Sequence, residues 1–195
     1  MKKTTLAILF AASCISSSAL AANSGNFYIQ GDLLSSAISV SDSDEFGGAA
    51  FGQRLSLGYA FEQVPVRIAA DFTNYGKWSE EASSSYGYGN VYAKADLKIK
   101  SFGVSGFYDF KNFGDFVPYL GLRLSYNHGK MDVSASNGYS YAEGSDSETS
   151  MGLGGVLGFQ YNFTKQLYLN VALEGSRLFS DVNAGSAQIG LGYRF

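Results

Sequence analysis

The chain has 195 residues, of which 46% are hydrophobic, 15% aromatic and only 16% charged, with 24 glycines and two prolines. A net charge of −3 provides no basic surface for nucleic acid, and one Cys and one His exclude a disulfide framework and leave little for a zinc site. Beyond the first fifteen residues no apolar run approaches the ~18 residues that a membrane-spanning helix requires. A composition rich in glycine and aromatic residues and poor in helix formers favours β-structure.

The N-terminus is typical of a secretory signal peptide. A start of Met and two Lys is followed by an apolar run over 6–12 and by a small-x-small sequence that ends at Ala21. We expect residues 1–21 to be removed after export and 22–195 to form the mature domain, with cleavage after Ala21 or Ala22. The single Cys lies inside this leader, so the mature chain is expected to contain none.

Eight segments of the mature chain alternate apolar and polar residues with a period of two, which predicts β-strands with one apolar face. In chain order they cover 27–33, 51–61, 66–73, 101–110, 119–126, 152–161, 167–174 and 187–195. The connections between them are alternately short and long.

An even number of amphipathic strands of about ten residues with such connections is typical of a transmembrane β-barrel. Hydrocarbon offers no hydrogen-bond partner to an open sheet edge, so the sheet must close. We predict an all-β fold, an eight-stranded antiparallel up-and-down transmembrane β-barrel with four surface loops. A soluble lipocalin-like barrel is the alternative, and it would point the aliphatic face inward. Glycines and charges on the polar face, and aromatic residues at the ends of the apolar face, favour the membrane.

Charged residues of both signs fall on the predicted inner face. They are Asp32, Arg54, Arg67, Asp71, Asp109, Arg123, Glu174 and Arg194. The interior of an eight-stranded barrel is only wide enough for side chains to fill, and buried charges are tolerated when they are paired. We therefore expect an ion-pair network that fills the lumen and leaves no open pore. The network either holds the barrel together or forms a path for protons or ions.

Motifs on the predicted strands carry a family resemblance. They include FYIQGD at 27–32, LSLGY at 55–59, VPYLGLRLS at 117–125 and LGYRF at 191–195. With these motifs in this order, the chain resembles the opacity family of porin-like outer-membrane adhesins, and within it the short-looped members. The resemblance covers nearly all of the mature chain, the strands better than the loops.

The resemblance implies an eight-stranded barrel in the outer membrane of a Gram-negative bacterium, with roles in adhesion or surface recognition. In such families, alternating apolar and aromatic residues before a terminal Phe are the signal that the barrel-assembly machinery reads, here Leu191, Tyr193 and Phe195. The family label "porin" does not match a filled lumen, and we treat it as a class name.

With periplasmic termini, the long connections at 35–50, 74–100, 128–150 and 178–185 face the outside. Tyrosine among Ser and Gly provides contact area at low entropic cost. The candidate surface-binding residues are Trp78, Tyr86, Tyr88, Tyr139 and Tyr141. We expect these loops to bind host-cell or serum proteins. The alternatives are a structural envelope barrel that contacts only lipopolysaccharide, and a small-solute porin.

Other polar residues near the loops provide weaker indications. Lys98 and Lys100 share the outward parity of their strand, so they either meet lipid phosphates or lie on an ordinary hydrated hairpin edge. His128 lacks a Ser two residues later, as a lipid deacylase would need, and the acidic run 42–45 lacks the spacing and Gly of an EF-hand loop. We expect no catalytic residue, cofactor or metal site.

Overall fold

A computed structural model describes residues 27–40, 43–86, 89–136, 141–180 and 182–195. The predicted signal peptide at 1–21 lies outside the described residues. Within the described residues, no helix is long and apolar enough to cross a membrane. The single-turn 3-10 helix η2 (Lys111–Phe113) lies in a turn between two strands.

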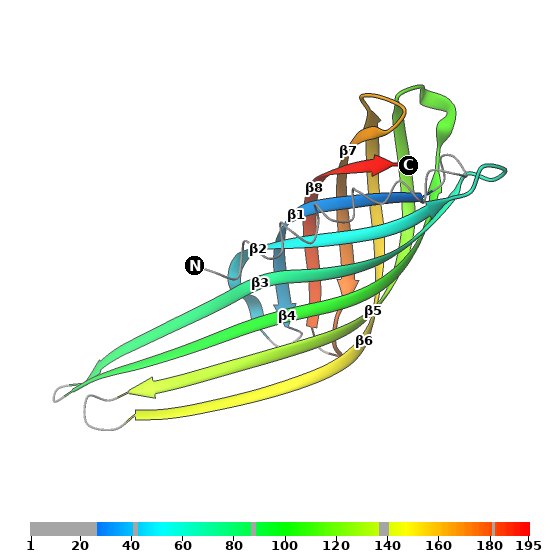
Figure 1. Cartoon of the computed structure of the whole chain (residues 1–195). Helices are drawn as coiled ribbons and strands as arrows, with labels where there is room; N and C mark the ends of the chain where they lie inside the picture. The colour runs from blue at the N-terminus through cyan, green and yellow to red at the C-terminus, as the bar shows by residue number, and fades with distance from the viewer. Residues whose placement is uncertain (1–26, 41–42, 87–88, 137–140, 181) are drawn as a thin grey trace.

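Eight antiparallel strands form a closed barrel in which each strand pairs with its sequence neighbours and the last pairs with the first (Figure 1). The strands are β1 (Phe27–Val40), β2 (Ser43–Ala60), β3 (Val66–Tyr86), β4 (Gly89–Asp109), β5 (Phe116–Ser136), β6 (Tyr141–Asn162), β7 (Leu167–Arg177) and β8 (Val182–Arg194). The predicted fold class, strand number and up-and-down order are therefore confirmed.

The aliphatic face of each strand points out of the barrel. Leu122 is 65% exposed, whereas its neighbour Arg123 is 1% exposed and lies inside. The same alternation runs along β7 and β8, where every second residue is buried or, as at Gly190 and Arg194, partly buried. A soluble barrel of lipocalin type would have the opposite arrangement, because its aliphatic residues form the core. This apolar outer surface is the one that contacts lipid.

The strands differ in length, and the difference sets the shape of the molecule. β3, β4 and β5 have 21 residues each and β6 has 22, whereas β7, β8 and β1 have 11, 13 and 14. A tilted strand needs only about 9–11 residues to cross a membrane. The ends of β3–β6 therefore extend beyond the barrel as a four-stranded sheet, which Figure 1 shows. We call residues 77–86, 89–100, 128–136 and 141–150 the projecting sheet.

The projecting sheet corrects part of the loop prediction. The long connections expected at 35–50, 74–100 and 128–150 are largely β-strand. β1 pairs with β2 as far as Val40↔Ser43, β3 with β4 as far as Tyr86↔Gly89, and β5 with β6 as far as Ser136↔Tyr141. Their Ser- and Gly-rich composition concealed the alternation, because few of these residues are aliphatic.

The projecting sheet begins where β3 separates from β2. The β2–β3 pairing ends at Gln53↔Asn74, and the β3–β4 register shifts between Asn74 and Lys77. Gly76 in this bulge has φ = 95°, and a Cβ at that position would lie 2.2 Å from the carbonyl oxygen of Phe51. Only glycine satisfies both conditions.

Candidate functional site: barrel interior and projecting sheet

The part of the interior nearest the termini holds an ion pair surrounded by aromatic rings. Arg67 Nε donates to both carboxylate oxygens of Asp109, at 2.7 and 2.9 Å. The guanidinium carbon lies 4.8 Å from the ring centroid of Tyr119 and 4.9 Å from that of Phe107. The rings replace part of the hydration that this buried cation loses.

Asp32 lies in the next layer and is held by neutral donors. Its carboxylate accepts hydrogen bonds from Gln30 Nε2 at 2.9 and 3.1 Å and from Asn170 Nδ2 at 2.8 Å. The Tyr168 hydroxyl donates to Gln30, and the Tyr119 hydroxyl donates to Asn170. A chain of hydrogen bonds from uncharged donors to Asp32 and its neighbours thus crosses the lumen from β1 to β5 and β7.

The centre of the lumen contains four charged side chains from four strands. Arg123 of β5 binds both oxygens of Asp71 on β3, at 2.6 and 3.0 Å. Arg54 of β2 lies 2.7 Å from Glu174 of β7, and Arg123 lies 3.5 Å from the other Glu174 oxygen. All four side chains are buried, so two positive and two negative charges meet where solvent is largely excluded.

Arg194 has neutral partners. Its guanidinium stacks on the Tyr168 ring at 4.2 Å and donates to Gln160 and Asn162 at 2.6 and 2.7 Å. Of the eight charged residues predicted to face the lumen, six therefore form ion pairs in two separate groups. Asp32 and Arg194 stand outside those groups among the described residues.

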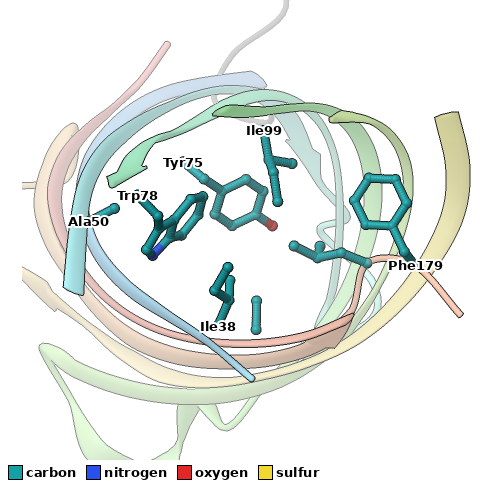
Figure 2. Close-up of a cluster of buried hydrophobic side chains, with 8 residues drawn as sticks. Ile38, Ala50, Tyr75, Trp78, Ile99 and Phe179 are labelled. Carbon is teal, nitrogen blue, oxygen red and sulfur yellow. The ribbon is translucent and has the colours of Figure 1, made fainter. Parts of the chain in front are cut away.

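An apolar cluster occupies the lumen at the end away from the termini (Figure 2). It contains Ile38, Ala50, Tyr75, Trp78, Ile99, Leu178, Phe179 and Ala184. Trp78 is 0% exposed, and its indole nitrogen donates to the backbone oxygen of Ser36 at 3.2 Å.

The sequence-based prediction that Trp78 offers a surface for ligands is therefore wrong. Phe72 points outward, and strict alternation along β3 would place Trp78 on the same outer side. The bulge between Asn74 and Lys77 adds one residue and reverses the parity, which turns the indole into the lumen.

Little space remains between these layers. The cavity lined by Tyr28, Asp32, Arg54 and Arg67 has a volume of about 20 Å³. A space of this size holds about one water molecule. The side chains around this cavity therefore pack closely.

The projecting sheet has two chemically different faces. The inner face continues the lumen side of the strands and is apolar, with Leu97 opposite Met131 and Ala95 opposite Val133. Met131 is 40% exposed and Val133 is 42% exposed, so this face is open to solvent. We call Leu97, Ala95, Met131 and Val133 the apolar face.

Two carboxylates border the apolar face on β6. Asp146 pairs in register with Met131, and Glu148 pairs with Gly129. The apolar face was not predicted, although the sequence contains a signal for it. The alternation of strands β4 and β5 continues through 93–99 and 129–135, where apolar residues and Gly still occupy every second position.

Two of the four tyrosines predicted to bind ligands lie at strand ends of the projecting sheet. Tyr86 is the last residue of β3 and Tyr141 the first of β6, whereas Tyr88 and Tyr139 lie outside the described residues. His128 is exposed, with its Nδ1 3.2 Å from the Thr149 hydroxyl. No group of three or more metal-ligating side chains occurs in the part of the chain that the structure describes.

Residues 57–195 match the family described as "Opacity family porin protein". The chain belongs to this family. Opacity protein opA57 of Neisseria gonorrhoeae is 28% identical over 192 residues, which cover 73% of this chain and 77% of that protein. An uncharacterized protein of Haemophilus influenzae is 39% identical over 169 residues, 87% of this chain and 89% of that protein.

Solved structures show the same barrel. Neisserial surface protein A is 27% identical, with a TM-score of 0.62 over 89% of this chain and all of that chain. Ail of Yersinia pestis, solved with the heparin analogue sucrose octasulfate, has a TM-score of 0.60 over the same shares at 22% identity, which supports the fold alone. This opacity-family protein is thus an outer-membrane β-barrel of a Gram-negative bacterium.

Proposed function

We propose that this opacity-family barrel is a surface recognition protein that binds host-cell or serum proteins through its projecting sheet. In this proposal the termini are periplasmic, so the projecting sheet faces the outside. The apolar face carries the proposal, because Leu97, Met131 and Val133 lie beyond the membrane part of the barrel and two of them are more than one-third exposed. Contiguous exposed apolar surface commonly marks an interaction site.

The charged residues beside the apolar face indicate what kind of protein would bind there. Asp146 and Glu148 add negative charge along one side of the face, on strand β6. A protein segment with an apolar stripe flanked by Lys or Arg would complement both features, since charge at an interface rim steers association and suppresses wrong partners. Tyr86 and Tyr141, which lie at strand ends of the projecting sheet, would extend the contact.

The alternative functions make different predictions. A small-solute channel requires an open path, whereas the lumen contains the charged layers, the apolar cluster and a cavity of about 20 Å³. We expect planar-bilayer recordings of the folded protein to show no steady conductance. Stable openings of nanosiemens size would contradict the filled lumen and favour the channel.

Truncation of both hairpins tests whether the projecting sheet binds at all. Ser79 pairs with Asp96, and Asp132 pairs with Ser145, so residues 80–95 and 133–144 can each be replaced by an Asn-Gly turn without a change of register. Attachment of whole bacteria to cultured epithelial cells and to immobilised serum proteins should then fall to that of bacteria without the protein. Unchanged attachment would refute the adhesion proposal in favour of a purely structural barrel.

A point variant tests the apolar face itself. Met131→Ser and Val133→Ser together should abolish attachment and leave the barrel folded, as shown by a heat-dependent shift in gel mobility. Leu97 is left unchanged because it packs against the apolar cluster in the lumen. Ser134→Ala, on the opposite face of β5, is the matched control and should attach as the wild type does. If the double variant attaches normally while the truncation does not, binding resides at the tips and not on the apolar face.

A further inference from the structure

Five basic side chains lie together on the outer face of the projecting sheet, at its base. Lys77, Lys98 and Lys130 form one cross-strand row over β3, β4 and β5. Lys100 and His128 form the row next to it, on the side of the membrane. We call these five residues the basic patch. The sequence pointed to Lys98 and Lys100 alone, and only the strand register brings the other three beside them.

The basic patch lies directly above the aromatic border of the membrane region. Phe72, Phe102 and Tyr126 form the next outward-facing row, and all three are about half exposed. Aromatic residues in this position lie at the head-group level. One pleat separates this row from Lys100, which is about 7 Å along the strand. The lysines are therefore within reach of lipid head groups.

The basic patch has more positive than negative charge. Asp96 forms an ion pair with Lys77 at 2.8 Å, and the Asp132 carboxylate lies 2.9 Å from Lys130 Nζ and 3.3 Å from Lys98 Nζ. Two carboxylates thus face four lysines. Within the described residues, no carboxylate lies within ion-pair distance of Lys100.

The opposite sector of the barrel lacks such a patch. At the outer ends of β1, β7 and β8 the outward-facing residues include Ala37, Gly175 and Gly185, which pair across these strands. Arg177 is the charged residue described there, and its guanidinium donates to the backbone oxygen of Ser180. Positive charge is therefore concentrated on the side of the barrel that carries the projecting sheet.

We propose that the basic patch binds the phosphate groups of the lipopolysaccharide in the surrounding outer leaflet. Lysine ammonium groups bind phosphates through charge-assisted hydrogen bonds, and several adjacent lysines at a membrane surface add their attractions. Asp96 and Asp132 hold three of the lysines in position, and Lys100 lies nearest the head groups. The bound lipid anchors the base of the projecting sheet to the membrane on one side.

The test measures binding of fluorescent lipopolysaccharide to the folded, full-length mature chain in zwitterionic detergent micelles. We expect the variant K77Q/K98Q/K100Q/K130Q to bind about tenfold more weakly or worse. The matched control K111Q/K165Q removes two lysines from the turns at the other end of the barrel and should bind as the wild type does. Folding of every variant is checked by its heat-dependent gel mobility.

Two further ligands identify the chemistry that is recognised. Dephosphorylated lipopolysaccharide should bind the wild type and the four-lysine variant equally weakly, and vesicles of phosphatidylglycerol should bind more weakly than lipopolysaccharide does. The proposal is overturned if the four-lysine variant binds like the wild type, if the control loses as much affinity, or if removal of the phosphates has no effect. Attachment through the apolar face is measured with other variants, so either proposal can fail alone.

Discussion

The barrel interior and the projecting sheet both contain ion pairs of similar length, but in opposite surroundings. Arg123 and Asp71 approach to 2.6 Å with side chains 1% and 3% exposed, whereas Lys77 and Asp96 approach to 2.8 Å with side chains 43% and 18% exposed. Inside, the partners have lost their water, so the removal of one leaves a buried charge. Outside, water and salt screen the pair. Distance alone therefore does not indicate what an ion pair contributes.

The same comparison applies to the roles of the two regions. Charges in the lumen are arranged to satisfy one another, which makes the interior a fixed part of the fold. On the outer face of the projecting sheet, the lysines outnumber the carboxylates that pair with them. On the inner face, two carboxylates lie beside the apolar face. Both faces are therefore available to partners. Substitutions in the two regions should therefore differ in their effects on folding and stability.

The largest effect is expected from a change at the C-terminus, where the last strand closes the barrel against the first. Deletion of Phe195 removes the backbone nitrogen that donates to the Phe27 backbone oxygen at 3.0 Å. It also removes the ring that packs edge-on against Tyr193, with the two ring centroids 5.4 Å apart. If the terminal aromatic residues are the assembly signal, most of the protein should disappear from the outer-membrane fraction. Phe113→Ala, an exposed aromatic residue in a turn, serves as control. A normal yield of the deletion variant would refute the assignment of the signal.

Loss of one interior charge should strongly destabilise the barrel. Arg123→Ala leaves Asp71 without its bidentate partner and Glu174 with Arg54 alone. The free energy of unfolding should fall by about 3–5 kcal/mol, as is usual when one partner of a buried pair is removed. Urea titration of the protein folded into lipid vesicles measures this change. If Arg123→Ala left the free energy of unfolding nearly unchanged, as we expect for the exposed Lys98→Ala, water would have to screen the interior ion pairs as well.

Glycines that differ only in the side they face should respond differently to alanine. A Cβ at Gly58 would lie 2.1 Å from Cζ of the Tyr28 ring inside the lumen, whereas a Cβ at Gly106 on the lipid side would have nothing within 4 Å. Gly58→Ala should cost about 1–3 kcal/mol of unfolding free energy, because the ring must move. Gly106→Ala should be close to neutral. Equal effects would mean that the lumen has room to adjust.

The smallest effect is expected on the projecting sheet. Lys98→Ala removes an exposed partner of Asp132 and should leave the urea midpoint unchanged within error. Hydrogen bonds from Lys130 and Ser145 lower the pKa of Asp132 to about 2. Because this pKa is lowered, the pairing is present at neutral pH and is lost only as the pH falls from about 4 towards 2. A clear shift of the urea midpoint of Lys98→Ala at pH 7 would show that the exposed ion pair with Asp132 does stabilise the protein.

The sequence predicted the architecture well because every strand in the membrane obeys one rule. Leu120, Leu122 and Leu124 had to face lipid, so Arg123 had to face the lumen. The rule failed at Trp78, where one extra residue in a bulge reversed the side without a clear mark in the composition. The same rule also predicted loops where the strands in fact continue, because Ala, Ser and Gly stand there in place of large aliphatic residues.

The strand number, the family and the side that the residues of the membrane-spanning strands face could all be predicted from the sequence. These follow from local alternation, because a barrel in lipid admits only one placement of aliphatic side chains. The tertiary structure decided which charges meet. Arg54, Asp71, Arg123 and Glu174 come from four strands, and only the closure and stagger of the sheet bring them to one level of the lumen. In the same way, it was register that joined Lys77, Lys98 and Lys130 into one row.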